Sequence, residues 1–481
     1  MKKFLIFFIS TLGFGQINWE FEIIDSVDYF HSTDLDFRWC SIALDANNIP
    51  HIIYYKASKL IHAFPCGSDW QKEIVESGFK YYCFSLIFDF NNTAHLSYYR
   101  YDEYLNKFYL CCARRNSTGW LINVVDSINY WPYWYGIYAS IDVDTLGHPG
   151  IAYVTWNLTD SLCYLKYIHY NGTNWDTSVV EYDSIYVHTQ TYVTDWNPSL
   201  KFDSKNTPII AFNQLYYQSI DYDTVKIAYF DDSLSKWIVS PIVWFPPDGQ
   251  PSLSLELDNQ DFPHIALCRL WYLRYVWWDG ITWQHLPTEI NIGDYGAVID
   301  LKLDSLNNPH IAFKGDFLTP FPNYCYYEDS IWHRYIPFDN DSLLSFGGIS
   351  MVLDYHSNPH FAYSISKYNG NTNIFGIKYA KGTFVGIEED RGIANKKMVL
   401  EVYPSISNCL LNIESVYQTQ DETELAIYDA CGAKRKSIKI GRHHPGGYRT
   451  TLNLADLPCG TYFAVLKQKN VQVQKKFLLV R

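Results

Sequence analysis

The stretch Leu303-Asp304-Ser305-Leu306-Asn307-Asn308-Pro309-His310-Ile311-Ala312-Phe313 decides the fold, because versions of it occur seven times in the chain. It contains the end of one strand, a tight polar turn and a second apolar strand. An Asp side chain can accept hydrogen bonds from turn N–H groups, and a proline at the start of the second strand costs no ladder hydrogen bond there. We therefore expect each copy to be a β-hairpin.

The seven copies are anchored by aspartates that lie 44 to 59 residues apart, a spacing typical of propeller blades. These anchors are Asp45, Asp89, Asp144, Asp203, Asp258, Asp304 and Asp354. Five residues after the anchor, six copies have proline and one has Ala94. The following position is a histidine in five copies: His51, His95, His264, His310 and His360. Four residues before the anchor, six copies have serine and the other has Asp300.

A third strand follows every hairpin, and in each copy except the last a tryptophan-bearing fourth strand comes after it. The tryptophans are Trp70, Trp120, Trp175, Trp237, Trp283 and Trp332. The last copy has none, but Trp19 precedes the first anchor. We therefore predict an all-β fold over residues 16–385, a seven-bladed β-propeller closed by strand exchange. The strand around Trp19 would complete the blade built from Ser350 to Ala380, which hides edges that could otherwise template aggregation.

The recurring histidines and aspartates have a structural interpretation. One histidine per blade, spread radially, cannot converge on a single ion at about 2 Å. We expect each histidine to hydrogen-bond across its hairpin to the anchor aspartate or a turn carbonyl. The 11 cysteines form no CxxC pair, and most are expected to be small buried strand residues. We expect neither a metal nor a cofactor.

Turns before the tryptophan strands, such as Asp279-Gly280-Ile281-Thr282-Trp283, resemble degenerate Asp-box turns of sialidase-like propellers. The match is partial, because Asp and Gly are adjacent and the leading Ser is missing. In that family the resemblance implies an arginine cluster that binds a carboxylate. The few arginines of the predicted propeller give no convergent triad, which argues against sialidase activity; they are Arg38, Arg100, Arg114, Arg115, Arg274 and Arg334.

Long aromatic loops are expected on one face of the propeller, and exposed aromatic rings stack on sugars or anchor protein partners. The richest is Asn129-Tyr130-Trp131-Pro132-Tyr133-Trp134-Tyr135. The candidate ligand-binding residues are Trp131, Tyr133, Trp134, Tyr82, Trp156, Tyr217 and Trp244. The alternative is that these aromatics cover the blade edges as a second core. Catalytic residues are not identified, since no Ser/His/Asp elbow, phosphate loop or HExxH motif is found.

Charge and the N-terminus limit the possible partners. The net charge of −13 over 481 residues opposes binding to nucleic acid or an anionic lipid surface. Residues 1–15 combine Lys2-Lys3 with a short apolar run and small residues, a pattern typical of a secretory signal peptide. A buried N-terminal strand is the alternative. No later segment has the eighteen apolar residues of a transmembrane helix.

Residues 386–397 are polar and charged and are predicted to be a linker, followed by a small β-sandwich over 398–481. The segment contains Val402-Tyr403-Pro404, Ile427-Tyr428-Asp429-Ala430-Cys431-Gly432 and Leu454-Ala455-Asp456-Leu457-Pro458. It resembles the type A C-terminal sorting domain of the type IX (Por) secretion system. The resemblance implies interaction with that machinery, passage through a Gram-negative-type envelope, and release or attachment at the outer-membrane surface. An ordinary accessory sandwich is the alternative.

Together these features predict a secreted or cell-surface propeller that is a binding module for a glycan or a protein, rather than an enzyme, and that is a monomer. The alternatives are a glycan-active hydrolase or lyase with its site on the aromatic-loop face, and a purely structural surface protein. Propellers can assemble acids from distant loops, so missing motifs do not exclude an enzyme.

Overall fold

The computed structural model describes most of the chain and forms two compact units, one containing Trp19–Gly382 and the other Thr383–Arg481. The described ranges are 16–29, 40–129, 138–157, 162–184, 187–188, 191–192, 196–214, 223–245, 252–269, 272–286, 298–314, 322–328, 330–335, 344–368, 373–385, 399–403, 406–407, 410–417, 422–430, 432–442, 446–468 and 471–479. Every regular element in these ranges is a β-strand, and they contain no helix able to cross a membrane. The predicted signal peptide and linker lie outside them.

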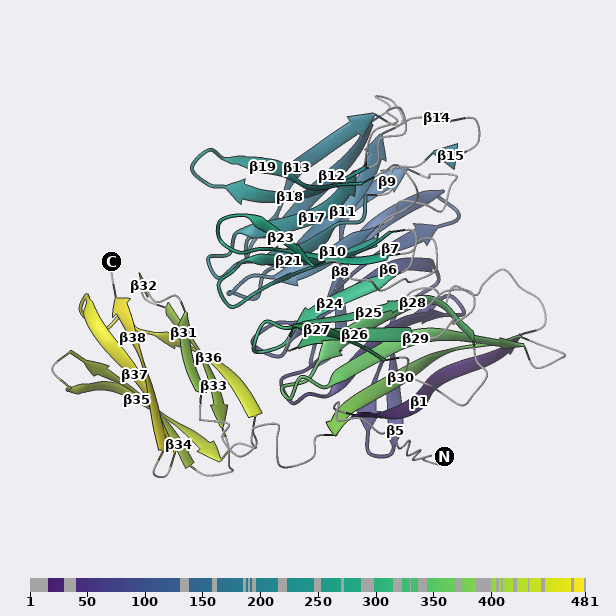
Figure 1. Ribbon diagram of the computed structural model, residues 1–481. Helices are drawn as coiled ribbons and strands as arrows, with labels where there is room; N and C mark the ends of the chain where they lie inside the picture. The colour runs from purple at the N-terminus through teal and green to yellow at the C-terminus, as the bar shows by residue number, and fades with distance from the viewer. Residues whose placement is uncertain are drawn as a thin grey trace. The chain divides into compact units, whose positions relative to one another are not determined.

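The first unit contains seven four-stranded antiparallel sheets within the described residues, and we number them in chain order (Figure 1). Sheet 1 is β2 (Cys40–Leu44), β3 (Pro50–Lys56), β4 (Lys59–Cys66) and β5 (Asp69–Ser77). Sheet 2 is β6 (Lys80–Phe88), β7 (Ala94–Asp102), β8 (Lys107–Asn116) and β9 (Gly119–Asn129). Sheet 3 is β10 (Ala139–Val143), β11 (Pro149–Asn157), β12 (Leu162–Tyr170) and β13 (Trp175–Ser184). A two-stranded ribbon follows, β14 (Val187–His188) and β15 (Thr191–Tyr192).

The remaining sheets repeat this order. Sheet 4 is β16 (Ser199–Phe202), β17 (Pro208–Gln214), β18 (Asp223–Asp231) and β19 (Lys236–Phe245). Sheet 5 is β20 (Ser252–Leu257), β21 (Pro263–Arg269), β22 (Tyr272–Trp278) and β23 (Trp283–Leu286). Sheet 6 is β24 (Ile299–Leu303), β25 (Pro309–Lys314), β26 (Pro322–Glu328) and β27 (Ile331–Tyr335). Sheet 7 is β28 (Leu344–Leu353), β29 (Pro359–Tyr368), β30 (Asn373–Val385) and, on the far side of β30, β1 (Gln16–Tyr29).

Each anchor aspartate closes the turn between the first and second strands of its sheet. In sheet 6 one carboxylate oxygen of Asp304 accepts hydrogen bonds from the backbone N–H groups of Leu306 and Asn308, both at 2.8 Å. Asn307, between them, has a φ of +65°, and the corresponding residue of every other anchor turn also has positive φ. Asn, Asp, Ser and Gly tolerate this conformation, which explains the polar sequence of the turn.

Hydrogen bonds link the first strands of successive sheets. At the position four residues before the anchor, the side chain accepts from a backbone N–H of the next sheet, with distances from 2.8 to 3.4 Å. In sheet 6 the acceptor is Asp300, whose carboxylate accepts a hydrogen bond from the backbone N–H of Met351. In the other six sheets the acceptor is the serine hydroxyl. The last link joins sheet 7 to sheet 1, from Ile42 N to Ser350 Oγ at 3.3 Å. The recurring serine is therefore an inter-sheet acceptor.

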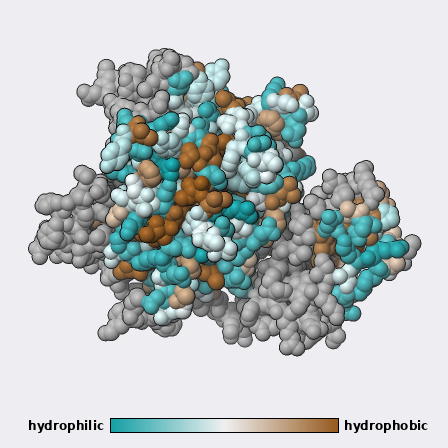
Figure 2. Space-filling view, turned by 180° about the vertical axis from the view of Figure 1, so that it is seen from behind, coloured by the Kyte–Doolittle hydropathy of each residue, from teal (hydrophilic) through white to brown (hydrophobic). Residues whose placement is uncertain are grey.

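The tryptophan strands are the outermost strands, and their indoles pack on the preceding sheet. Trp70 contacts Tyr379 of sheet 7 edge to face, with ring centroids 5.3 Å apart, and Trp237 contacts Tyr167 at the same distance. Apolar clusters accordingly lie between sheets, where flat faces meet. Exposed apolar side chains also occur on the outer strands, including Leu121 and Val124 of β9. Figure 2 shows apolar residues gathered in a band on one side of the molecule.

Trp19 occupies the equivalent position in sheet 7. Its indole stacks on Phe361 of β29, with centroids 5.2 Å apart, and meets Tyr324 of sheet 6 edge to face at 6.0 Å. Gly376 of β30 allows β1 to lie close to β30, since a Cβ at position 376 would lie 2.4 Å from the backbone oxygen of Asp25 on β1. The Asp25 carboxylate in turn accepts hydrogen bonds from Tyr54 and Lys56 of sheet 1.

The second unit contains two sheets around its own apolar core. One has the order β31 (Val399–Tyr403), β33 (Leu410–Tyr417), β36 (Gly446–Asn453). The other has the order β32 (Ile406–Ser407), β38 (Val471–Leu479), β37 (Gly460–Gln468), β34 (Glu422–Asp429), β35 (Lys434–Arg442). Core residues such as Leu411, Leu452 and Phe477 come from both sheets, as in a β-sandwich.

Candidate functional site

The recurring histidines lie in buried chains of polar contacts. His95 Nε2 lies 3.0 Å from Asp89 Oδ2, and His360 Nε2 lies 3.5 Å from Asp354 Oδ2. The corresponding Nε2–Oδ2 distances are 3.4 Å for His264 and 3.7 Å for His310. His95 and His360 therefore make the hydrogen bond to the anchor aspartate that the sequence predicts, whereas His264 and His310 face their aspartates at ion-pair distance only.

A tyrosine completes the chain in sheets 5, 6 and 7. His360 Nδ1 lies 2.6 Å from the hydroxyl of Tyr379, and His310 Nδ1 lies 2.5 Å from that of Tyr324. His264 pairs in the same way with Tyr275. Burial would raise the pKa of Asp354, but hydrogen bonds from His360 and Asn358 outweigh it and lower that pKa to about 2. These buried Asp–His–Tyr chains hold strands together and present no reactive group at the surface.

His51 departs from this arrangement. Its Nδ1 lies 2.8 Å from Nε2 of His62, whose Nδ1 lies 2.8 Å from Glu73 on β5. Glu73 also accepts hydrogen bonds from Arg115 and Trp120 of sheet 2, at 2.8 Å each. Burial and the neighbouring His62 lower the pKa of His51 to about 4. The result is a neutral imidazole pair oriented by a carboxylate, at the seam between sheets 1 and 2.

The Asp-box-like turns also have a structural role. In the β22–β23 hairpin, Asp279 Oδ1 accepts hydrogen bonds from the N–H groups of Ile281 and Thr282, both at 2.8 Å. Asn171 does the same in the β12–β13 hairpin, accepting from Thr173 and Asn174. A carboxylate or amide oxygen that satisfies turn N–H groups needs no ligand.

The innermost strands contain a charged cluster that the repeat pattern does not predict. Two residues before the anchor, sheets 1, 2 and 7 have Ala43, Ile87 and Val352. Sheets 3 to 6 have charged residues at this position: Asp142, Lys201, Glu256 and Lys302. Charge at a position that is apolar in the other three sheets is the signal in the sequence that distinguishes these four residues.

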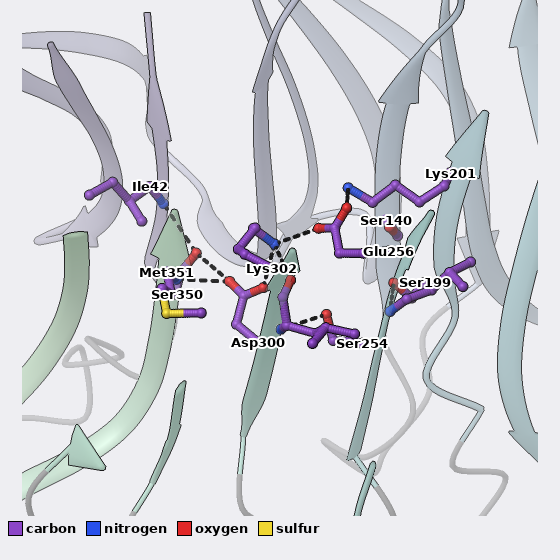
Figure 3. A network of polar contacts seen from close by, with 12 residues as sticks. Ile42, Ser140, Ser199, Lys201, Ser254, Glu256, Asp300, Lys302, Ser350 and Met351 are labelled. Atoms are coloured by element: carbon purple, nitrogen blue, oxygen red, sulfur yellow. Dashed lines mark hydrogen bonds and ion pairs between the residues drawn. The ribbon is translucent and has the colours of Figure 1, made fainter. Parts of the chain in front are cut away.

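Three of these residues form an ion-pair chain that crosses from sheet to sheet (Figure 3). Lys201 Nζ lies 2.8 Å from one oxygen of Glu256, and Lys302 Nζ lies 2.8 Å from the other. Lys302 also contacts Asp300 at 2.7 Å. Burial would raise the pKa of Glu256, but Lys201 and Lys302 outweigh it and lower that pKa. The two lysines thus keep the buried Glu256 carboxylate charged and paired.

Asp142 has a different environment. It is buried, and its Oδ2 accepts a hydrogen bond from Phe202 N of sheet 4 at 2.7 Å. Burial raises the pKa of Asp142 to about 6, against the opposing effects of Lys201 and the Phe202 N–H. This carboxyl group therefore changes its charge near neutral pH. In the described part of the chain, no group of three or more His, Cys, Asp or Glu side chains is arranged to hold a metal ion.

The structure describes three of the seven aromatic residues predicted to bind a ligand. Trp131, Tyr133, Trp134 and Tyr217 lie outside the described residues. The structure corrects the placement of the other three, since Tyr82 lies on β6, Trp156 on β11 and Trp244 on β19 instead of in loops. These strands continue pairing beyond the expected loop starts, with Tyr82 opposite Tyr99 and Trp156 opposite Cys163. Tyr82 and Trp156 are buried between sheets 2 and 3, as the second-core alternative expects.

Comparison with solved structures gives propellers of low similarity. The fucose-recognising, six-bladed lectin from Aleuria aurantia has 13% identity and a TM-score of 0.42, covering 65% of this chain and 97% of the lectin. The α-L-arabinanase from Penicillium chrysogenum has 12% sequence identity and a TM-score of 0.43, and the match covers 62% of this chain and 92% of the arabinanase. The polysaccharide lyase Uly1 has 10% sequence identity and a TM-score of 0.44, and the match covers 72% of this chain and 89% of the lyase. Scores this low give no information about the ligand of this chain. No curated protein matches it.

The C-terminal unit gives a clear match. Residues 401–480 match the family described as the secretion system C-terminal sorting domain. This span lies inside the range predicted for the sorting domain and covers most of the second unit. Such a domain indicates export through the type IX system to the cell surface or beyond it.

Proposed function

We propose that the seven sheets are the blades of a closed propeller over residues 16–385, sealed by β1, with a linker over 386–397 and the sorting domain over 398–481. Three observations support the closure. β1 lies beside β30 in sheet 7, Trp19 makes the inter-sheet contacts of the other tryptophans, and Ile42 N bonds to Ser350. A seal of this kind leaves no open edge at the chain ends.

We further propose that the exported propeller is a binding module for an extracellular glycan or protein. The observation that carries this proposal is the use made of the recurring polar residues. The serines link neighbouring sheets, the aspartates close turns, four of the five histidines face those aspartates, and His51 contacts His62. Residue types suited to catalysis are therefore occupied in the scaffold wherever the repeat supplies them.

The candidate binding surface is the end of the propeller opposite the anchor turns, which we call the loop end. Because the sheets are antiparallel meanders, each outer strand ends there and the first strand of the next sheet begins there. The connection from β9 to β10 contains Trp131, Tyr133 and Trp134, and the connection from β17 to β18 contains Tyr217. Aromatic rings with few charges suit stacking on sugars or contact with apolar protein surfaces.

A glycan array combined with a turnover screen on polymeric sugars tests this proposal. We expect saturable binding to one class of glycan without release of reducing ends or unsaturated products. Trp131→Ala with Trp134→Ala should weaken binding at least tenfold, whereas Tyr229→Ala, an exposed aromatic on β18, should not. Turnover of any sugar would replace the binding module by the glycan-active enzyme, and absence of any saturable glycan or protein ligand would overturn both.

A further inference from the structure

The centre of the five-stranded sheet in the sorting domain is apolar on both of its faces. One face packs on the core, where Tyr462, Ala464 and Leu466 of β37 are buried. Phe463 and Val465 alternate with these residues along β37, so they lie on the other face, and both are half-buried. A sheet with one face on a core and the other in water normally alternates apolar and polar residues. Apolar residues at both sets of positions indicate that a second surface covers this other face.

The strand register shows which residues surround Phe463 and Val465, and we call this surface the outer face. Three rows of four residues cross it from β38 through β37 and β34 to β35. They are Lys476, Phe463, Tyr428 and Lys434; then Gln474, Val465, Ala426 and Ser437; then Gln472, Lys467, Glu424 and Lys439. Leu478, which is 38% exposed, lies beyond the first row and opposite Thr461. The outer face therefore has an apolar and aromatic centre with lysines on either side.

The outer face has a surplus of positive charge. Its three rows contain four lysines and a single acid, Glu424. This acid is already paired, since Lys434 Nζ lies 2.6 Å from its Oε1 and the Ser437 hydroxyl donates to the same oxygen at 3.0 Å. Lys467 and Lys476 are exposed. Two exposed ammonium groups thus remain beside the apolar centre.

Charged residues next to the outer face do not cancel this surplus. In the β34–β35 hairpin Arg435 forms an ion pair with Asp429 at 2.6 Å, and Lys436 forms one with Asp456 at 3.1 Å. The strands of the three-stranded sheet contain two acids and one base, which are Glu401, Glu414 and Arg449. The basic residues of the domain are therefore concentrated in the five-stranded sheet.

The sorting domain as a whole differs in charge from the rest of the chain. Residues 398–481 contain 11 Lys and Arg and 7 Asp and Glu, a net charge of +4, whereas the whole chain has −13. A basic surface with an apolar centre fits a partner surface that has carboxylates around an apolar patch.

We propose that the outer face is the surface through which the sorting domain binds a protein of the export machinery, and that this protein presents such an acidic, apolar-centred surface. Aromatic residues at the centre and polar residues at the rim are the usual composition of a protein interface. Charges that are complementary across the contact speed the encounter and exclude basic partners. The inference rests on the sorting assignment and not on the proposed binding function of the propeller.

The depth of the apolar residues favours a protein over an anionic membrane. An element that lies on a membrane buries its apolar side chains about 5–10 Å into the head-group boundary. Phe463, Val465 and Tyr428 are half-buried within the sheet, and Leu478 is the one large apolar residue exposed among the described residues of the outer face. An opposing protein surface contacts side chains set within a sheet, whereas a bilayer takes up those that project from it.

Delivery of the full chain to the cell surface, in a host with a type IX system, tests the outer face. Cell fractionation and protease accessibility measure the delivered fraction. Lys476→Glu and Phe463→Glu should each lower it about tenfold or more and leave folded protein in the periplasm, because a carboxylate would then oppose the carboxylates of the partner. Lys476→Arg keeps the charge and should be delivered like wild type.

The matched control is Lys475→Glu, the same change of charge at the adjacent exposed residue. Lys475 lies opposite Ala464, whose side chain belongs to the core side of the sheet. This variant should be delivered like wild type. Thermal unfolding of each purified variant checks its fold, and Lys476→Glu decides the test if Phe463→Glu is destabilised, because Lys476 is exposed.

Normal delivery of Lys476→Glu, or an equal loss from Lys475→Glu, would overturn the inference. Cosedimentation of the purified full chain with phosphatidylglycerol vesicles separates the two kinds of partner. We expect no binding to them, and binding that Lys476→Glu abolishes would replace the protein partner by a lipid surface. Deletion of residues 398–481 tests the sorting assignment separately. If the deleted chain is retained while Lys476→Glu is delivered, the assignment stands and the outer face alone is refuted.

Discussion

Replacing Trp19 by alanine tests whether the first strand seals the propeller. The indole stacks on Phe361 at 5.2 Å and meets Tyr324 edge to face at 6.0 Å. Removing a packed tryptophan costs about 3–5 kcal/mol, and aromatic pairs of this kind supply about 0.5–1.5 kcal/mol each within that total. We therefore expect Trp19→Ala to lower the free energy of unfolding by about 3–5 kcal/mol.

Urea unfolding followed by tryptophan fluorescence and circular dichroism measures this loss. The matched control is Trp283→Ala, because Trp283 begins the outer strand of sheet 5, as Trp19 lies on the outer strand of sheet 7. If β1 seals the ring, the two variants should lose similar stability. An unchanged unfolding midpoint for Trp19→Ala, beside a lowered one for Trp283→Ala, would refute the closure.

Gly376→Ala provides an independent perturbation of the same contact. The new Cβ would lie 2.4 Å from Asp25 O, a backbone atom that can move away only if β1 separates from β30. If both variants act by displacing β1, their effects should not add, because a strand already displaced cannot be displaced again. Additive losses would indicate that Trp19 stabilises the protein in some other way.

Three further predictions concern pH and export. Burial raises the pKa of Asp142 to about 6, so its ionisation opposes folding and the stability it contributes falls as pH rises from about 4 to 6. In urea unfolding measured from pH 3 to 8, Asp142→Asn should be more stable than wild type by about 1–3 kcal/mol at pH 7 and equal to it below pH 4. A variant that is less stable than wild type at pH 7 would contradict this. The pH dependence is reversed for Asp354, because its pKa is lowered to about 2 and its ionised form stabilises the fold. Asp354→Asn should lose about 2 kcal/mol of unfolding free energy at pH 7, and this loss should shrink as pH falls from about 4 towards 2 in the same urea experiment. A loss that does not depend on pH would exclude the ionised carboxylate as its cause. Deleting residues 398–481 should leave the seven sheets folded but retained in the periplasm, as checked by circular dichroism and cell fractionation, and normal surface delivery would contradict the sorting assignment.

Much of the fold could be predicted from sequence, because its determinants are local. An aspartate followed by Asn, Ser or Gly and then proline encodes its own turn, and seven copies at similar spacing leave few architectures. The contact from His360 to Asp354 could be predicted for the same reason, since the two residues lie six apart across one hairpin. The sorting domain was recognisable from several short motifs in a fixed order.

Other features depend on partners distant in sequence. Glu256 looks like an ordinary strand carboxylate until the inter-sheet contacts place Lys201 and Lys302 on either side of it. The need for glycine at position 376 arises from a backbone atom of β1, about 350 residues earlier. Tyr82 was misplaced because turn residues mark the end of a strand more reliably than aromatic ones, which suit strands as well as loops.

The position of β1 in sheet 7 also sets the timing of folding. Residues 16–29 are synthesised first, but their partner strand begins only at Asn373. At about 5–20 residues per second, the ribosome needs roughly 17–70 s to make the intervening chain. Throughout that interval the opening segment has no strand to pair with, so it is available to a chaperone or a translocase. The proposed ring can therefore close only when synthesis is nearly finished, because its last strand pair joins the two ends of the propeller sequence.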